Sequence, residues 1–189
     1  MRALTFEYHG IARQELNSSR SIAAIAGVRE HRFVRLPDLK EAGDIPRAVF
    51  EGLPPTYIPL RNSIFYSLAA SYAEETGASV IVGGHNKDDA EVFEDVGPEF
   101  FAHLQKALRA GSVSLRRNRL QILRPLKQRT KVGVLKLASS LGVPLELTWS
   151  CHGDGDSPCM RCAGCTSRRL AFSRAKLGDP LSGATRKIT

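Results

Sequence analysis

Strand-like and helix-like segments alternate along this chain from Ala3 to Ser150, and this alternation limits the fold more than any other feature. Strand patterns cover residues 3–8, 31–36, 79–84, 119–126 and 145–150. Apolar residues recur with helical spacing in residues 20–28, 61–78, 98–111 and 130–143. Each helix-like segment has a glycine near its end, where a helix can stop. This order predicts an α/β fold with a mostly parallel sheet and right-handed crossovers.

Three segments carry more specific expectations. The apolar "SVIVGG" (residues 79–84) has the composition of a parallel strand that is buried on both faces. The segment "LELTWS" (residues 145–150) is predicted to be the last strand. Residues 37–59 are rich in Pro, Gly and charge, and they are predicted to form a long loop with a short helix around residues 47–50.

The composition is that of a globular chain of 189 residues, with 42% hydrophobic and 24% charged residues. A chain of this length fits one domain and can bury a sufficient core without disulfide bonds. No apolar run approaches the roughly 18 residues of a membrane span, and "MRALTFEYHG" lacks the apolar core of a signal peptide. We therefore expect a cytoplasmic protein with no membrane partner.

The net charge of +8 comes from 27 Lys and Arg against 19 Asp and Glu, and it suggests an anionic partner. Nucleotide phosphates and RNA are both candidates, and a solvated basic surface is the alternative. Positive charge is concentrated at residues 116–119 and 167–176. Neither segment interleaves its basic residues with several aromatics, so an RNA-stacking surface is not indicated, although tRNA stays open as a partner.

All four cysteines of the chain lie close together near its end, with the spacing C-x7-C-x2-C-x2-C. They are Cys151, Cys159, Cys162 and Cys165. In a reducing cytosol such a cluster favours metal over disulfides. Four thiolates satisfy a structural zinc ion and leave no open coordination position, so catalysis is expected elsewhere. An iron–sulfur cluster and free buried cysteines are the alternatives.

A polar segment, "VGGHNKDDAEVFED", follows the predicted strand at residues 79–84, at the end where open α/β sheets bind ligands. Its two glycines permit close approach of a ligand to the backbone. An amide and two carboxylates could hold a ribose, a base edge or magnesium. These residues are Gly83, Gly84, Asn86, Asp88 and Asp89. The alternative is an ordinary strand-to-helix loop in which Asn and Asp cap a helix.

Cations stand at two further positions that suit phosphate. Arg61 and Asn62 are at the predicted start of a helix, where an adjacent Arg makes a natural phosphate site. Arg124 and Lys131 follow a predicted strand end. The alternatives are a helix cap by Asn62 beside a solvated Arg61, and exposed cations. Four histidines have no partner by spacing and are predicted to be solvated: His9, His85, His103 and His152.

Together these pieces resemble the 7-cyano-7-deazaguanine synthase (QueC-type) family in its archaeal form. The resemblance covers almost the whole chain in the family's order. It is carried by "LTFEYH" (residues 4–9), "PTYIPLRNSIFYSLAASYAEETGASVIVGGHNKDDAEVFED" (55–95), "PEFFAHLQKAL" (98–108), "RPLKQRTKVGVLKLASSLGVPLELTWSC" (124–151) and "CAGCTSRRLAF" (162–172). It implies a Rossmann-like α/β fold of the adenine nucleotide alpha-hydrolase type with a C-terminal four-cysteine zinc loop.

The family's activity is the ATP-dependent conversion of 7-carboxy-7-deazaguanine to the nitrile with ammonia, in the pathway to the tRNA bases queuosine and archaeosine. The resemblance therefore implies a carbon–nitrogen ligase that uses ATP with Mg²⁺, holds structural zinc on its four cysteines and forms a homodimer. It implies catalytic roles for Lys131 and Asp95. It also implies a nucleotide or substrate cleft lined by Arg61, Asn62, Gly83, Gly84, Asn86 and Asp88.

The expected organisation is a Rossmann-like nucleotide-binding domain at residues 1–150, a zinc loop with a C-terminal helix at 151–176, and a flexible tail at 177–189. The family's S-G-G-x-D-S phosphate loop does not occur in the sequence, which starts at what resembles the family's second strand, so an N-terminally truncated form is expected. The loop could be encoded upstream, lie on a separate chain, or be lost in a paralogue without adenylation. A non-catalytic zinc-containing paralogue and an amidotransferase acting on tRNA are the alternative functions.

Overall fold

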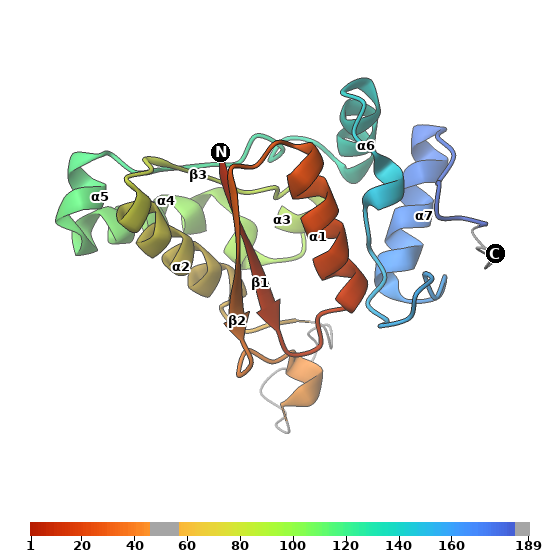
Figure 1. Ribbon diagram of the computed structural model, residues 1–189, viewed down its shortest axis with the longest axis horizontal. Coiled ribbons are helices and arrows are strands. Elements are labelled where there is room, and N and C mark those ends of the chain that lie inside the picture. Colours follow the sequence, from red (N-terminus) through yellow and green to blue (C-terminus); the bar gives the residue numbers. More distant parts are fainter. Residues whose placement is uncertain (46–56, 184–189) are drawn as a thin grey trace. The chain divides into compact units, whose positions relative to one another are not determined.

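The computed structural model describes residues 1–45 and 57–183 (Figure 1). The chain divides into two compact units: unit 1 comprises residues 1–57 and 135–189, and unit 2 comprises residues 58–134. The boundaries of these units differ from the three ranges expected from the sequence. Those three ranges stay a prediction. The short helix expected around residues 47–50 lies outside the described residues. Among the described helices, none has the length and hydropathy that crossing a bilayer requires.

Unit 1 begins with a β–α–β segment formed by β1 (Arg2–Tyr8), α1 (Arg13–Ile25) and β2 (Glu30–Leu36). The two strands pair in parallel along all seven residues of each, and α1 lies alongside β1 (Figure 1). Both strands were predicted. The helix begins at Arg13, earlier than the predicted residue 20. Its first turns were not predicted because they are mostly polar and carry no apolar periodicity.

The rest of unit 1 contains η1 (Ala42–Asp44), η4 (Leu145–Leu147), α7 (Ala163–Ala175) and the second part of α6 (Lys131–Ser140). The strand expected at residues 145–150 is wrong, because the chain there forms the 3₁₀ helix η4 followed by extended backbone. The Thr148 hydroxyl and backbone N–H both donate to the Leu145 carbonyl, at 2.6 and 3.2 Å. Arg168 binds the carbonyls of Leu145 and Thr148 as well. Because these carbonyls already accept hydrogen bonds from Thr148 and Arg168, they do not pair with a neighbouring strand.

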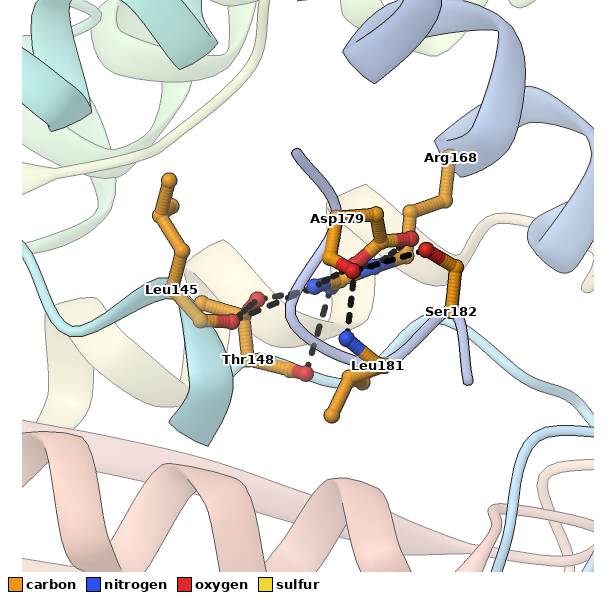
Figure 2. Close-up of polar contacts among 6 residues, drawn as sticks. All are labelled: Leu145, Thr148, Arg168, Asp179, Leu181 and Ser182. Atoms are coloured by element: carbon orange, nitrogen blue, oxygen red, sulfur yellow. Dashed lines mark hydrogen bonds and ion pairs between the residues drawn. The ribbon is translucent and has the colours of Figure 1, made fainter. Parts of the chain in front are cut away.

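Arg168 also fixes the segment that follows α7 (Figure 2). Its Nε and Nη2 donate to the Asp179 carboxylate at 2.9–3.0 Å, and each side chain is only 9% exposed. Its Nη1 donates to Thr148 Oγ1 at 2.7 Å, on the other side of the guanidinium. The Leu181 backbone N–H donates to Asp179 in turn. The first residues of the expected tail are therefore held against η4 and α7, whereas residues 184–189 lie outside the described residues.

Unit 2 is a helical layer on one face of a short strand pair. Its elements are α2 (Arg61–Thr76), β3 (Val80–Val82), α3 (Lys87–Ala90), η3 (Glu94–Val96), α4 (Pro98–Gly111), α5 (Val113–Arg117), β4 (Gln121–Leu123) and the start of α6. As the sequence predicts, α2 ends at a left-handed Gly77 (φ 69°) and α4 has a proline in its first turn. The core consists of Ala70, Ala73, Leu115 and Leu120.

β3 and β4 pair in parallel, so the predicted α/β class with parallel strands is confirmed. Among the described residues, however, the strands form two separate pairs, β1–β2 and β3–β4, instead of one sheet. The expectation that β3 is buried on both faces is also wrong. Ile81 packs on the core, whereas Val80 and Val82 are 44% and 64% exposed. Because successive side chains of a strand point to opposite faces, a helical layer on one face buries only the central residue.

Candidate functional site

The four cysteines come together in unit 1, as their spacing predicts. Their Sγ atoms all lie within 4.8 Å of one another, with 4.0 Å between Cys159 and Cys165 and 3.9 Å between Cys162 and Cys151. Thiolates at about 2.3 Å from a tetrahedral zinc ion stand about 3.8 Å apart. The cluster can therefore hold one metal ion such as zinc.

Backbone amides around the cluster point at its sulfur atoms. The N–H groups of Gly153 and Cys159 donate to Cys151 Sγ at 3.3 Å. The next two cysteines repeat the pattern at 3.4 Å, with Cys162 N–H donating to Cys159 Sγ and Cys165 N–H donating to Cys162 Sγ. Such second-layer donors orient metal ligands and stabilise thiolate charge.

The pKa values of two of these thiols are shifted in opposite directions. Backbone hydrogen bonds from Arg161 and Cys162 lower the pKa of Cys159 to about 6. Burial and the hydrogen bond with Cys162 raise the pKa of Cys165 to about 12. A bound metal ion would hold all four sulfurs as thiolates, because coordination replaces the thiol protons.

The loop between Cys151 and Cys159 is also hydrogen-bonded to the start of α1. The helix is preceded by Ala12, which offers no side-chain cap. Asp154, which is distant in sequence, caps the helix instead: its Oδ1 accepts from the Arg13 backbone N–H at 2.8 Å. Asp156 accepts from the side chains of Arg13 and Gln14 at 2.9 and 3.1 Å. The loop therefore satisfies a helix end that would otherwise lack a partner for this donor.

The other predicted site residues all lie in unit 2, where Asn86 organises the loop after β3. Asn86 Oδ1 accepts from the backbone N–H groups of Asp88 and Asp89 at 2.9 and 3.2 Å. Asp89 Oδ2 accepts from the Asn86 backbone N–H at 3.4 Å, which completes a capping box for α3, and it also accepts from the Asn86 side-chain amide at 2.7 Å. The helix-capping alternative is therefore confirmed for Asn86.

Asp88 and Lys131 meet where the loops after β3 and β4 join. Asp88 Oδ2 accepts from the Lys131 backbone N–H at 2.9 Å, at the start of α6. The Lys131 ammonium lies 3.6 Å from Asp89 Oδ1. A backbone hydrogen bond from Lys87 to Arg129 (2.8 Å) adds a third link. The structure thus brings these predicted residues together at the carboxyl ends of two parallel strands, where such sheets bind ligands.

Asn62 and Asp95 form a second polar contact in unit 2. Asn62 is only 3% exposed. Its backbone N–H donates to Asp95 Oδ2 at 3.3 Å, and its side chain donates to the Asp95 carbonyl at 3.2 Å. Leu60, directly before the helix, has a left-handed backbone (φ 53°) that is unusual for its residue type. Asp95 therefore anchors the start of α2. Arg61, the first residue of α2, directly follows the left-handed turn at Leu60.

The sequence does not predict an aromatic cluster that lies beside these residues. The His85 ring lies 5.8 Å from Tyr66 and 5.3 Å from Phe101, measured between ring centroids. The Arg124 guanidinium stacks over Phe101 at 4.3 Å, and its Nη1 donates to the Val96 carbonyl. His85 is half-buried, so its expected solvation is wrong. The residues come from separate elements, and no spacing pattern in the sequence links them.

Charges of both signs act on His85. Desolvation lowers its pKa most, and Arg61 and Arg124 lower it as well, whereas Asp89 and Asp95 raise it. Burial raises the pKa of Tyr66 to about 12. The arrangement combines a neutral imidazole, a protonated phenol and two guanidinium groups, which can bind anionic oxygens and accept a proton.

Comparison with known proteins identifies the family. A family model described as "Queuosine biosynthesis protein QueC" matches residues 1–176. The chain belongs to the QueC family. It is 36% identical to the 7-cyano-7-deazaguanine synthase of Trichodesmium erythraeum, over 95% of this chain and 87% of the relative. The synthase of Thermoplasma acidophilum is 35% identical, over 96% of this chain and 80% of its own length. The synthase of Acaryochloris marina is 38% identical, over 97% and 88%.

Gly83 and Gly84 of this QueC-family chain have different surroundings. A Cβ on Gly83 would overlap the Tyr66 hydroxyl, whereas nothing lies within 4 Å of a Cβ on Gly84. We expect Gly83→Ala to lower the free energy of unfolding by about 1–3 kcal/mol, because overpacking displaces buried Tyr66. Gly84→Ala is the matched control, with an expected change within about 0.5 kcal/mol. Urea unfolding measures both. A similar loss in the two variants, or no recovery when Gly83→Ala is combined with Tyr66→Phe, would contradict this packing role.

The lowered pKa of His85 predicts a pH dependence of stability. Between its folded-state pKa and the ordinary value of 6.5, the unfolded chain binds more protons. The contribution of His85 is therefore present above pH 6.5 and is lost as pH falls through the folded pKa. Proton NMR, assigned with His85→Gln, should show titration below pH 6.5. Asp89→Asn should lower this pKa further, because Asp89 raises it. Titration at or above 6.5 would contradict the buried, neutral imidazole.

Proposed function

We propose that this chain is a 7-cyano-7-deazaguanine synthase, which converts 7-carboxy-7-deazaguanine and ammonia to the nitrile with ATP. The observation that supports this most is its identity of about 35% or more to synthases across nearly its whole length. The gathering of Asp88, Asp89 and Lys131 at the carboxyl ends of β3 and β4 agrees with a ligand site there.

The proposed reaction has two activation stages. The substrate carboxylate attacks the α-phosphorus of ATP, which gives an acyl adenylate and pyrophosphate. Ammonia then displaces AMP and releases a proton, which leaves the amide. The amide oxygen is adenylated by a second ATP, and loss of AMP and a proton gives the carbon–nitrogen triple bond. Each stage needs cations for anionic oxygens and an acceptor for a proton.

Residues of unit 2 match these needs. Arg61 and Lys131 supply positive charge for the phosphate and carboxylate oxygens, and the ATP would carry Mg²⁺. Asp95 anchors Asn62 and thereby the turn that carries Arg61. The main-chain groups at Gly84 are open to approach. The four cysteines would hold zinc as a structural ion, which supplies no step of the reaction.

The test is formation of AMP and nitrile by the purified chain. We expect AMP release that depends on both 7-carboxy-7-deazaguanine and ammonia, with two AMP for each nitrile detected by mass spectrometry. The same assay is run on the chain extended by any in-frame upstream sequence that encodes S-G-G-x-D-S. No AMP and no nitrile from either protein would reject the synthase. Salt-dependent tRNA binding without AMP formation would favour a tRNA-acting relative instead.

A further inference from the structure

Lys131 is held at both its main chain and its side chain by two successive carboxylates. Asp88 Oδ2 accepts from the Lys131 backbone N–H at 2.9 Å. Asp89 Oδ1 lies 3.6 Å from the Lys131 ammonium. The four-residue helix α3 therefore binds the first residue of α6 through two carboxylates. Asp88 binds the Lys131 backbone N–H, and Asp89 pairs with the Lys131 ammonium group.

Asp89 is itself fixed by its neighbour. Its Oδ2 accepts from the Asn86 side-chain amide at 2.7 Å and from the Asn86 backbone N–H at 3.4 Å. One carboxylate oxygen thus belongs to the capping box, and the other faces Lys131. Because the capping box sets the rotation of the carboxylate, the direction in which Asp89 presents its charge is determined by the loop after β3.

This ion pair adds little to stability. The Lys131 and Asp89 side chains are 44% and 29% exposed, and ion pairs at such sites contribute little to stability because solvent screens them. What the pair provides is a fixed position for a flexible side chain. An ammonium group has three N–H donors, so it can contact Asp89 and an anionic oxygen of a ligand at the same time.

We propose that Asp89 is a positioning residue, which holds the Lys131 ammonium where it contacts an anionic oxygen of a substrate. The oxygen belongs to a phosphate of ATP or to the carboxylate of 7-carboxy-7-deazaguanine. The identity of these two ligands rests on the proposed function. Asp89 was not among the residues assigned to the cleft by the family resemblance.

Competitive acetylation of lysines, measured by mass spectrometry, tests this on the folded full chain without requiring turnover. Acetylation of Lys131 is compared with that of exposed Lys136 as an internal reference, with increasing ATP in one series and increasing 7-carboxy-7-deazaguanine in the other. We expect one of the two ligands to protect Lys131. In Asp89→Asn the ligand concentration for half-protection should rise about tenfold, as expected for a weakened contact to a charged group.

Two further variants separate positioning from local structure. Asp89→Gln removes the charge, but Gln at the third helical position can still form a capping box, so a loss equal to that of Asp89→Asn supports positioning, whereas half-protection within about threefold of the wild type indicates a cap only. Glu91→Gln removes an acid of the same loop that pairs with Lys87, and it should leave protection unchanged.

The outcomes distinguish this inference from the proposed function. Equal half-protection in the wild type and Asp89→Asn, or no protection of wild-type Lys131 by either ligand, would overturn the positioning role. Protection that depends on Asp89 but is accompanied by no AMP or nitrile would reject the synthase and leave the positioning role supported.

Discussion

Replacing Arg168 by Met is expected to lower the free energy of unfolding by about 3–5 kcal/mol. The substitution keeps an unbranched side chain of similar length but removes all the hydrogen bonds that Arg168 donates to Asp179, Thr148 and Leu145. Asp179 would then remain at 9% exposure without its cation. An unpaired buried charge costs far more than the net value of the pair, and this desolvation makes the expected loss large.

Urea unfolding of three variants measures this effect. Arg169→Met is the matched control, because Arg169 is an exposed arginine of the same helix and should change stability by about 0.5 kcal/mol or less. The double variant Arg168→Met with Asp179→Leu should recover part of the loss, since it removes both charges together. Equal stability of Arg168→Met and Arg169→Met would show that the Arg168–Asp179 contact does not hold the C-terminal segment.

Removing the metal from the cysteine cluster is the second large expected effect. We expect one zinc ion per chain by elemental analysis, and a loss of about 3 kcal/mol or more in unfolding free energy after chelation. Cys165→Ser should produce a similar loss, because Cys165 is 5% exposed and carries one of the four ligand atoms. Three remaining thiolates do not complete a tetrahedral structural site.

The contact between Asp154 and α1 provides an internal check on this prediction. Asp154→Ala should cost about 1 kcal/mol in the zinc-loaded protein, as loss of a helix cap usually does, and much less after chelation, because the free loop no longer holds the carboxylate at Arg13. A chelator should also have no effect on Cys165→Ser. Unchanged melting of the wild type after complete zinc removal would show that the cluster is not a structural clasp.

Local patterns were sufficient for elements whose signals lie within a few residues. β1 and β2 follow from alternation, and α2 ends at Gly77 because only glycine adopts its left-handed backbone easily. The cysteine spacing predicted the cluster for the same reason, since two C-x2-C steps let one turn and the first residues of α7 present their sulfurs together. Such features depend on nearby backbone geometry, which the sequence specifies directly.

The sequence by itself therefore determined the α/β class, the four cysteines that can hold a metal ion, and the family. The tertiary structure decided which polar side chains act on which helix ends. Asp95 reaches Asn62 across 33 positions and Asp154 reaches Arg13 across 141. The tertiary structure also explains why residues 145–147 form the 3₁₀ helix η4 instead of the expected strand, since Arg168 donates hydrogen bonds to the carbonyls of Leu145 and Thr148. A carboxylate has the same local pattern whether it caps a distant helix or binds a ligand, so only the packing of distant segments distinguishes the two roles.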